Sequence, residues 1–105
     1  MDIIPLVAVP AQEATVVLAQ QQCRLRVYQR STGLFLDLYV NDMLVIGGVI
    51  CLDRNRVVRS LYLGFIGDLA FVDTQGNQDP TYDGIGVRYF LYYFAPDEVP
   101  KLVTI

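Results

Sequence analysis

The sequence predicts an all-β protein, a small antiparallel β-barrel or sandwich of six or seven short strands with extended arms at both ends. Three observations carry this prediction. Valine, isoleucine and threonine supply 26 of the 105 residues, whereas lysine and glutamate together number only three, a balance that favours strands over helices. Several segments alternate in sequence with the two-residue period of a strand. No segment repeats its apolar residues with the 3.6-residue period of a helix.

A chain of 105 residues and 11.8 kDa is expected to form one domain. With 53% hydrophobic and 18% charged residues, it carries too much apolar sequence to be disordered. We divide it into an N-terminal arm over residues 1–12, a β core over 13–94 and a C-terminal arm over 95–105. The arms are assigned because each contains two prolines, which confine a segment to sheet edges or to irregular extended structure.

The first strands form the clearest predicted hairpin. Residues 23–28 and 34–40 both alternate in sequence, and the turn-forming residues Ser31-Thr32-Gly33 lie between them. A two-residue turn at 32–33 and a four-residue loop both pair Arg30 with Phe35. In either case the same alternate residues of the two strands share the apolar face, whereas a three-residue loop would place apolar residues opposite polar ones.

A second tight turn at Asn41-Asp42 is predicted to add a third strand. Both residue types tolerate the positive φ that a type I′ hairpin turn requires. This turn is expected to bring Leu38 opposite Val45 and to create a three-stranded meander. Gly47-Gly48 then either ends the third strand or introduces a bulge.

Three further strands complete the predicted core. They lie near residues 57–65, 69–73 and 87–94. The polar segments 53–56 and 74–80 separate them by composition. Short antiparallel strands in this number are typical of a small barrel or a sandwich.

The second face of the meander carries more apolar residues than a solvated sheet face should. It is predicted to present Tyr28, Phe35, Tyr39, Leu44 and Ile46 beside Arg24, Arg26 and Asp37. Either the arms and the 74–86 loop fold back over such excess surface, or other subunits cover it. We favour other subunits, because enrichment of tyrosine and arginine at the expense of lysine and glutamate is typical of interfaces.

The residues needed for most enzyme chemistry are missing. Without histidine, neither a Ser-His-Asp triad nor a histidine-containing zinc site can form. Lys101 is the only lysine, and no phosphate-binding loop precedes it. Cys23 and Cys51 lie in apolar runs and are expected to be buried, inert thiols. The chain is therefore predicted not to be an enzyme and to use no cofactor.

Charge and hydropathy disfavour two classes of partner. The formal net charge is −3 and the isoelectric point is about 4.6, whereas nucleic-acid binders are usually basic on at least one face. The longest apolar run, residues 43–52, is half of a membrane span. The N-terminus also lacks the cationic start of a signal peptide. We therefore expect no nucleic acid, no membrane and synthesis in the cytoplasm.

Two polar clusters leave other interpretations open. Asp73, Asp79 and Asp83 lie in one loop, so a small ligand- or calcium-binding β-barrel that uses residues 73–83 is the alternative function. Turn formation explains the same residues. The basic cluster at 53–56, together with Arg59, could contact phosphates, an acidic loop of a partner, or its own Asp53.

Several stretches together resemble a known family of proteins. They are Ser31-Thr32-Gly33-Leu34-Phe35-Leu36-Asp37-Leu38-Tyr39-Val40-Asn41, Asp53-Arg54-Asn55-Arg56, Gly67-Asp68-Leu69-Ala70-Phe71-Val72-Asp73-Thr74-Gln75-Gly76, Asp79-Pro80, Gly84-Ile85-Gly86-Val87-Arg88-Tyr89 and the start Ile3-Ile4-Pro5-Leu6-Val7. In this ordered set the chain is similar to the baseplate plug proteins of contractile-tailed phages, which were first described in a cyanophage.

This resemblance implies a structural part of a virion: a plug or hub-associated protein of the tail baseplate that contacts tube and hub subunits. Its partners would be other baseplate, hub and tube proteins or copies of itself, in threefold or sixfold symmetry, and it would be assembled in the cytoplasm of the host bacterium. Lateral contacts are predicted for Arg26, Tyr28, Phe35 and Tyr39. Polar contacts to a neighbour are predicted for Arg54, Arg56 and Arg59.

Overall fold

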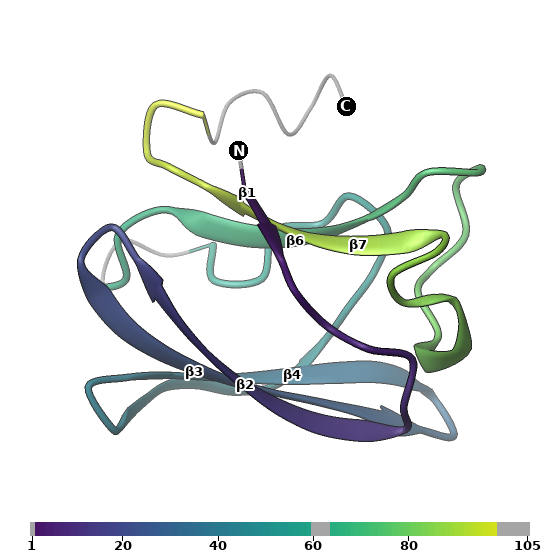
Figure 1. Ribbon diagram of the computed structural model, residues 1–105, viewed down its shortest axis with the longest axis horizontal. Helices are drawn as coiled ribbons and strands as arrows, with labels where there is room; N and C mark the ends of the chain where they lie inside the picture. The colour runs from purple at the N-terminus through teal and green to yellow at the C-terminus, as the bar shows by residue number, and fades with distance from the viewer. Residues whose placement is uncertain (1, 60–63, 99–105) are drawn as a thin grey trace.

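Two antiparallel sheets lie face to face in the computed structural model of the chain (Figure 1), which describes residues 2–59 and 64–98. One sheet has four strands in the order β2-β3-β4-β5, and the other has three in the order β1-β7-β6. The strands are β1 (Asp2–Ile4), β2 (Ala11–Leu18), β3 (Gln21–Arg30), β4 (Gly33–Val40), β5 (Met43–Ile50), β6 (Asp68–Asp73) and β7 (Tyr89–Phe94). The sheets do not close into a barrel, so the predicted all-β class is confirmed as a sandwich.

The core fills the space between the sheets. From the four-stranded sheet, alternate residues such as Leu25 and Leu36 point inward and are fully buried. From the other sheet, Phe71 and Leu91 meet them. This alternation follows from the two-residue period of each strand. Both thiols are buried, as the sequence predicts.

The β3–β4 hairpin has the predicted faces but a different register. Arg30 pairs with Gly33, not with Phe35, so the turn consists of Ser31 and Thr32. Because the two registers differ by two residues, the same side chains stay in the core. In the observed register Tyr28 lies opposite Phe35. Parity of the loop could fix the faces, but it could not separate two registers that share them.

The β4–β5 hairpin begins with the predicted turn, in which Asn41 and Asp42 have φ of 51° and 65°. The predicted pairing of Leu38 with Val45 is wrong, because Leu38 pairs with Ile46. One extra residue in β5 shifts the register, which turns Ile46 toward the core and away from the second face where the sequence placed it.

Gly47 and Gly48 make a second shift of register in β5. The predicted bulge is therefore confirmed, and the strand continues beyond it to Ile50. Gly48 has a φ of 65°, and its backbone N–H donates a hydrogen bond of 2.6 Å to the Asp37 carboxylate. A glycine is favoured where the backbone turns into the left-handed region.

The predicted strand over 57–65 is wrong for residues 57–59 and 64–65, which are irregular, and its remaining residues 60–63 lie outside the described ones. The Asp68 side chain explains the irregularity. It accepts hydrogen bonds from the backbone N–H groups of Val58 (2.8 Å), Arg59 (3.0 Å) and its neighbour Leu69 (2.7 Å). Donors that a strand would use for pairing are thus taken by a carboxylate.

The N-terminal residues run along the second sheet. Asp2–Ile4 pair with β7 of the same chain as its edge strand β1. The chain then descends to the four-stranded sheet and enters β2, a strand that the sequence analysis did not single out (Figure 1). At the other end, Ala95–Glu98 form a turn, and residues 99–105 of the predicted C-terminal arm lie outside the described part.

Within the described ranges, no helix has the length and hydropathy needed to cross a lipid bilayer. A short 3₁₀ turn, η2 (Tyr82–Gly84), precedes β7.

Candidate partner-binding face

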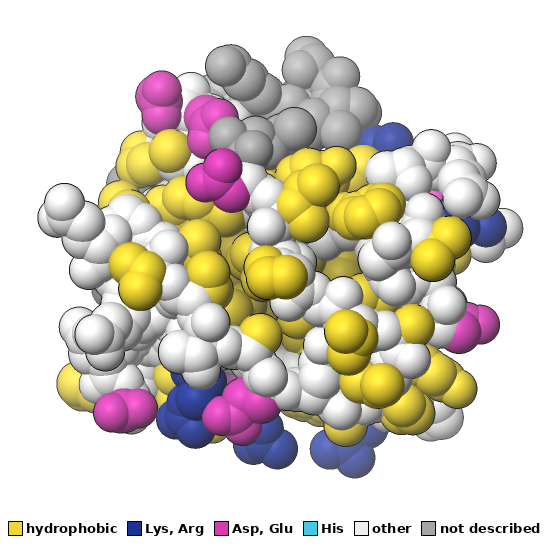
Figure 2. Space-filling model, viewed as in Figure 1, with side chains coloured by type: hydrophobic (Ala, Val, Ile, Leu, Met, Phe, Trp, Pro, Cys, Tyr) yellow, Lys and Arg dark blue, Asp and Glu magenta, His cyan; other side chains and the backbone are white. Residues whose placement is uncertain are grey.

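The surface of the four-stranded sheet that points away from the core is the main candidate site, and we call it the outer face. Its side chains follow from the strand alternation and the pairing register. They are Ala11, Glu13, Thr15, Val17, Gln22, Arg24, Arg26, Tyr28, Arg30, Phe35, Asp37, Tyr39, Leu44 and Ile50. Figure 2 shows charged side chains of both signs gathered along the lower margin of the molecule, where the four-stranded sheet lies in Figure 1.

Two stacked rings lie on this face near the β3–β4 turn. Tyr28 and Phe35 are neighbours across β3 and β4, with ring centroids 6.1 Å apart and planes 18° from parallel. The Tyr28 hydroxyl donates a 2.9 Å hydrogen bond to Asp37. Desolvation and then this carboxylate raise the pKa of Tyr28, so the hydroxyl stays a neutral donor.

A second aromatic contact lies farther along β4. The Arg24 guanidinium carbon lies 4.2 Å from the ring centroid of Tyr39, and its Nη1 pairs with Glu13 at 3.3 Å. The Nε atom of Arg24 is buried and has no hydrogen-bond partner. The contact with the Tyr39 ring and the ion pair with Glu13 together fix the position of the Arg24 side chain on the outer face.

Arg26 and Arg30 are exposed at the other end of β3. Neither guanidinium forms an ion pair or a hydrogen bond within the described ranges. Arg30 lies over the Tyr28 ring, 5.1 Å from its centroid. The two arginines and Tyr28 border a surface hollow of about 430 Å³, which also touches Asp37 and the entrance to β2 at Pro10. We call it the arginine hollow.

Apolar side chains extend the outer face toward both edges of the sheet. Val17 is 65% exposed, Leu44 is 58% exposed and Ile50 is 36% exposed. Single exposed apolar residues are ordinary, but these three add to the aromatic rings of the same face, and a sheet face of this composition favours a contact surface.

The predicted lateral contact residues therefore come together. Arg26, Tyr28, Phe35 and Tyr39 all lie on the outer face. Sequence reasoning missed the part of the face that β2 contributes, Glu13 and Val17. The signal was present, because Ala14, Val16 and Leu18 are spaced by two and face inward.

The predicted polar contact residues lie elsewhere, in the connection between β5 and β6, and bind within the chain. Arg54 pairs with Asp53 and donates to the carbonyls of Gly76 and Asp73, each at 3.2 Å. Arg56 pairs with Asp68 at 2.9 Å. Arg59 Nε donates a 2.6 Å bond to the Arg56 carbonyl. Their contact with a neighbour stays a prediction.

The carboxylates of the 73–83 loop are each engaged separately. Asp73 is buried and accepts two 2.7 Å bonds from Arg88, together with the N–H groups of Gln75 and Gln78. The Arg88 hydrogen bond holds the pKa of Asp73 well below its usual range. Asp79 accepts the Asp53 N–H at 2.9 Å. Among the described residues no three acidic or thiol ligands gather around one point, so this loop offers no observation in favour of calcium.

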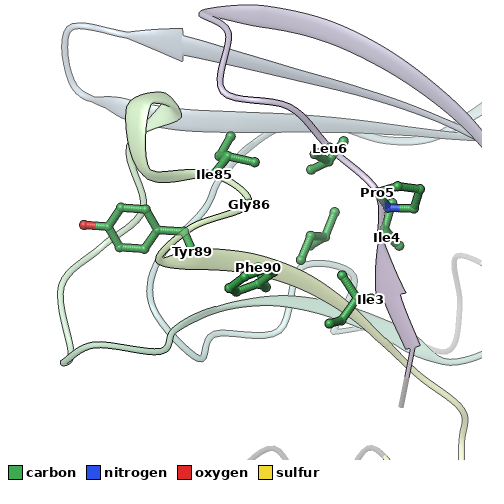
Figure 3. Close-up of a pocket in the computed structure, with 9 residues that line it drawn as sticks. Ile3, Ile4, Pro5, Leu6, Ile85, Gly86, Tyr89 and Phe90 are labelled. Atoms are coloured by element: carbon green, nitrogen blue, oxygen red, sulfur yellow. The ribbon is translucent and has the colours of Figure 1, made fainter.

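An apolar cavity of about 230 Å³ lies between the N-terminal segment and β7 (Figure 3). Residues Ile3 to Leu6 form one wall, and Ile85 and Phe90 belong to the opposite side. The Tyr89 hydroxyl points away from the cavity (Figure 3). The lining therefore offers apolar contact and no ionisable group.

A comparison with models of protein families gives a match that covers most of the chain. Residues 1–97 match the model of a protein family described as "Cyanophage baseplate Pam3 plug gp18". A comparison with curated proteins found no match. The matched residues include all seven strands and the entire outer face.

Proposed function

The chain belongs to the cyanophage baseplate Pam3 plug gp18 family, and from this membership we propose that it is a non-enzymatic plug or hub-associated protein that contacts tube and hub subunits of a contractile tail. A structural role in a phage tail baseplate follows from the family itself. The finer assignment names the surface that makes the contact, which is the outer face.

The observation that carries this proposal is the apolar and aromatic character of the outer face. The opposite face of the same sheet fills the core, so these residues lie outside the hydrophobic core of the sandwich. Tyrosine and arginine side chains together with exposed aliphatic residues on one face are typical of protein interfaces. A neighbouring subunit that covers them would remove this apolar area from water.

The proposed mechanism is mechanical. A standard interface buries about 800 Å² on each partner, an area that a four-stranded sheet face can supply. The two sheets are tied by one continuous core, so force applied to the outer face is transmitted to a rigid body. Such a part holds the hub closed until infection, and it needs no catalytic residue.

The proposed neighbours are hub and tube proteins of the same particle, with copies of the chain itself as a further contact in a threefold or sixfold arrangement. Arg56 and Arg59 are exposed and retain donors for a second polar contact. The protein would be made and assembled in the bacterial cytoplasm before it becomes part of the virion.

The test is incorporation into tails. A phage whose gene carries a nonsense codon is complemented by plasmid copies, and the chain is measured by quantitative mass spectrometry in purified tails. Val17→Glu with Leu44→Glu puts two charges on the outer face at exposed positions. We expect this variant to fold normally and its incorporation to fall at least about tenfold.

The matched control is Val87→Glu, because Val87 is 72% exposed and lies outside the outer face. It should enter tails as the unchanged chain does. Circular dichroism melting of all three purified proteins checks that they fold. Tails without the chain would contradict the proposal, and so would equal incorporation of the Val17 and Leu44 variant.

A further inference from the structure

We propose that the neighbour presents a carboxylate-bearing protein loop, and that this loop binds in the arginine hollow between Arg26 and Arg30. The inference rests on the proposed function of the outer face as a contact surface. It adds the chemistry of the partner at one defined place on that face.

The first argument is the distribution of charge pairs. Of the arginines that the structure describes, four pair with a carboxylate of the same chain, namely Arg24, Arg54, Arg56 and Arg88. Arg59 donates to a backbone carbonyl. Arg26 and Arg30 alone among them have no such partner within the described ranges. Arg26 lies between Glu13 and Asp37 in the pairing of the strands, but Glu13 pairs with Arg24 and Asp37 accepts from Tyr28, so the donors of Arg26 and Arg30 are left for a partner.

The second argument is geometry. Arg26, Tyr28 and Arg30 are spaced by two along β3, so their side chains share one face of the sheet. The two guanidinium groups therefore flank the Tyr28 ring at the mouth of the hollow. A planar guanidinium binds a carboxylate through two parallel N–H donors. Two guanidinium groups beside one hollow suit the carboxylate of an aspartate or glutamate that enters the hollow from the solvent side.

The third argument is what surrounds the cations. Asp37 also touches the hollow, but its Oδ1 atom already accepts hydrogen bonds from Tyr28 and from the Gly48 N–H. Glu13 lies opposite Arg26 in the pairing of β2 with β3, and its carboxylate pairs with Arg24. These two anions repel a continuous chain of phosphates more strongly than a single carboxylate, because the repulsion grows with the number of negative charges brought close. A protein loop is therefore favoured over nucleic acid.

Apolar surface beside the two arginines completes the fit. Ala11 and the Tyr28 ring line the hollow, and Phe35, which does not line it, stacks on that ring. The methylene groups of an acidic side chain can pack against this apolar surface. Ion pairs that are partly shielded by such a surface are stronger than exposed ones. The contact is therefore expected to contribute to affinity as well as to orientation.

The experiment adds purified protein back to baseplates isolated from the nonsense-mutant phage, and measures the bound chain at low and high salt. Arg26→Gln with Arg30→Gln removes both cations while keeping long polar side chains. We expect binding to fall at least about tenfold at 0.1 M salt, and the loss to shrink at 1 M salt because screening weakens the wild-type contact.

The control carries the same change of charge elsewhere. Asn77→Asp with Gln78→Glu also lowers the net charge by two, at exposed positions of the 74–80 loop far along the chain from β3. It should bind within about twofold of the unchanged chain. Arg26→Lys with Arg30→Lys keeps the charge without the planar fork and should give intermediate binding.

The outcomes separate this inference from the proposed function. If the unchanged chain binds the baseplates and the glutamine variant binds equally well, the acidic-loop inference is overturned and the baseplate role stands. If the unchanged chain does not bind at all, the proposed function fails. Binding of the unchanged chain to a labelled DNA duplex, lost in the glutamine variant, would assign the hollow to phosphate and overturn the carboxylate assignment. Second-site suppressors of the glutamine variant that replace an acidic residue of a hub or tube protein would support it.

Discussion

Asp73 shows how one side chain can organise a loop of fifteen residues between β6 and β7. Its two carboxylate oxygens accept bonds from Arg88 at the end of the loop and from the N–H groups of Gln75 and Gln78 near its start. The carboxylate is buried and ion-paired, so both charges are satisfied together. The residue composition predicted a loop here, but it could not show that the Asp73 carboxylate stabilises the folded loop.

Stability should depend on pH through Asp73. The Arg88 hydrogen bond lowers the pKa of Asp73 in the folded state, so its contribution is complete above the unfolded pKa of about 4 and is lost as pH falls further. We expect Asp73→Asn to be less stable than the unchanged chain at pH 7, and the difference to shrink toward pH 2.5. Urea unfolding at pH 7, 4 and 2.5 measures this. A constant difference across that range would contradict the assigned role.

The two thiols should be unreactive in the folded protein. Cys23 and Cys51 are buried, and burial raises the pKa of both thiols, that of Cys51 to about 12. At pH 8 only about one Cys51 thiol in ten thousand is then ionised. We expect almost no reaction with a chromogenic disulfide reagent under native conditions, and two thiols per chain in 8 M urea. Rapid native labelling of both would show that the core opens readily.

At the scale of elements, turn chemistry decided which hairpins could be recognised from sequence. Asn41-Asp42 is a strong signal for a turn with positive φ, and the hairpin is there. The β2–β3 turn uses Ala19 and Gln20, with φ of 50° and 64°. Neither residue type indicates such a turn, so the sequence does not predict β2. Its residues fall partly in the predicted N-terminal arm and partly in a stretch of the core without a predicted strand. Here strand pairing imposes a backbone that the local sequence does not prefer.

The strand predicted after residue 56 is wrong for the opposite reason. Val57 and Val58 are β-branched residues and predict a strand. In the structure they are buried, but Asp68 takes the N–H groups of Val58 and Arg59. A contact between residues ten apart therefore overrides a local preference, and periodicity carries no information about it.

Gly67 is the element-scale position where a substitution should cost most. Its φ is 97°, and a β carbon there would collide with the Phe94 carbonyl and the Tyr93 ring across the sheet. We expect Gly67→Ala to destabilise the fold by about 3 kcal/mol or more. Gly64 has a similar φ of 78°, and among the described residues none lies within 4 Å of an added β carbon, so Gly64→Ala should cost only about 1 kcal/mol. Urea unfolding compares the two, and equal losses would contradict the collision.

At the scale of the whole molecule, the sequence predicted the class of fold and the faces of its central strands. Alternation alone brought Arg26, Tyr28, Phe35 and Tyr39 to one surface, because a period of two assigns every residue of a strand to a face. It could not place Arg54 or Arg56, since both lie outside the strands and the carboxylate partner of Arg56, Asp68, lies twelve residues away at the start of β6. Alternation within one strand also could not predict the bulge that turns Ile46 inward, because the pairing register depends on both strands.

The family match and the two-layered fold lead to the same picture of the molecule. One face of the four-stranded sheet builds the core, and the other, which lies outside the core, carries apolar, aromatic and cationic side chains. A baseplate part needs such a surface, because its function is to be held by neighbours.

Electron cryo-microscopy of the intact baseplate tests this picture most directly. We predict density for the chain among hub and tube subunits, with the outer face in contact with a neighbour and an acidic side chain of that neighbour beside Arg26 and Arg30. A baseplate that lacks the chain, or one in which the outer face of the four-stranded sheet is open to solvent, would contradict it.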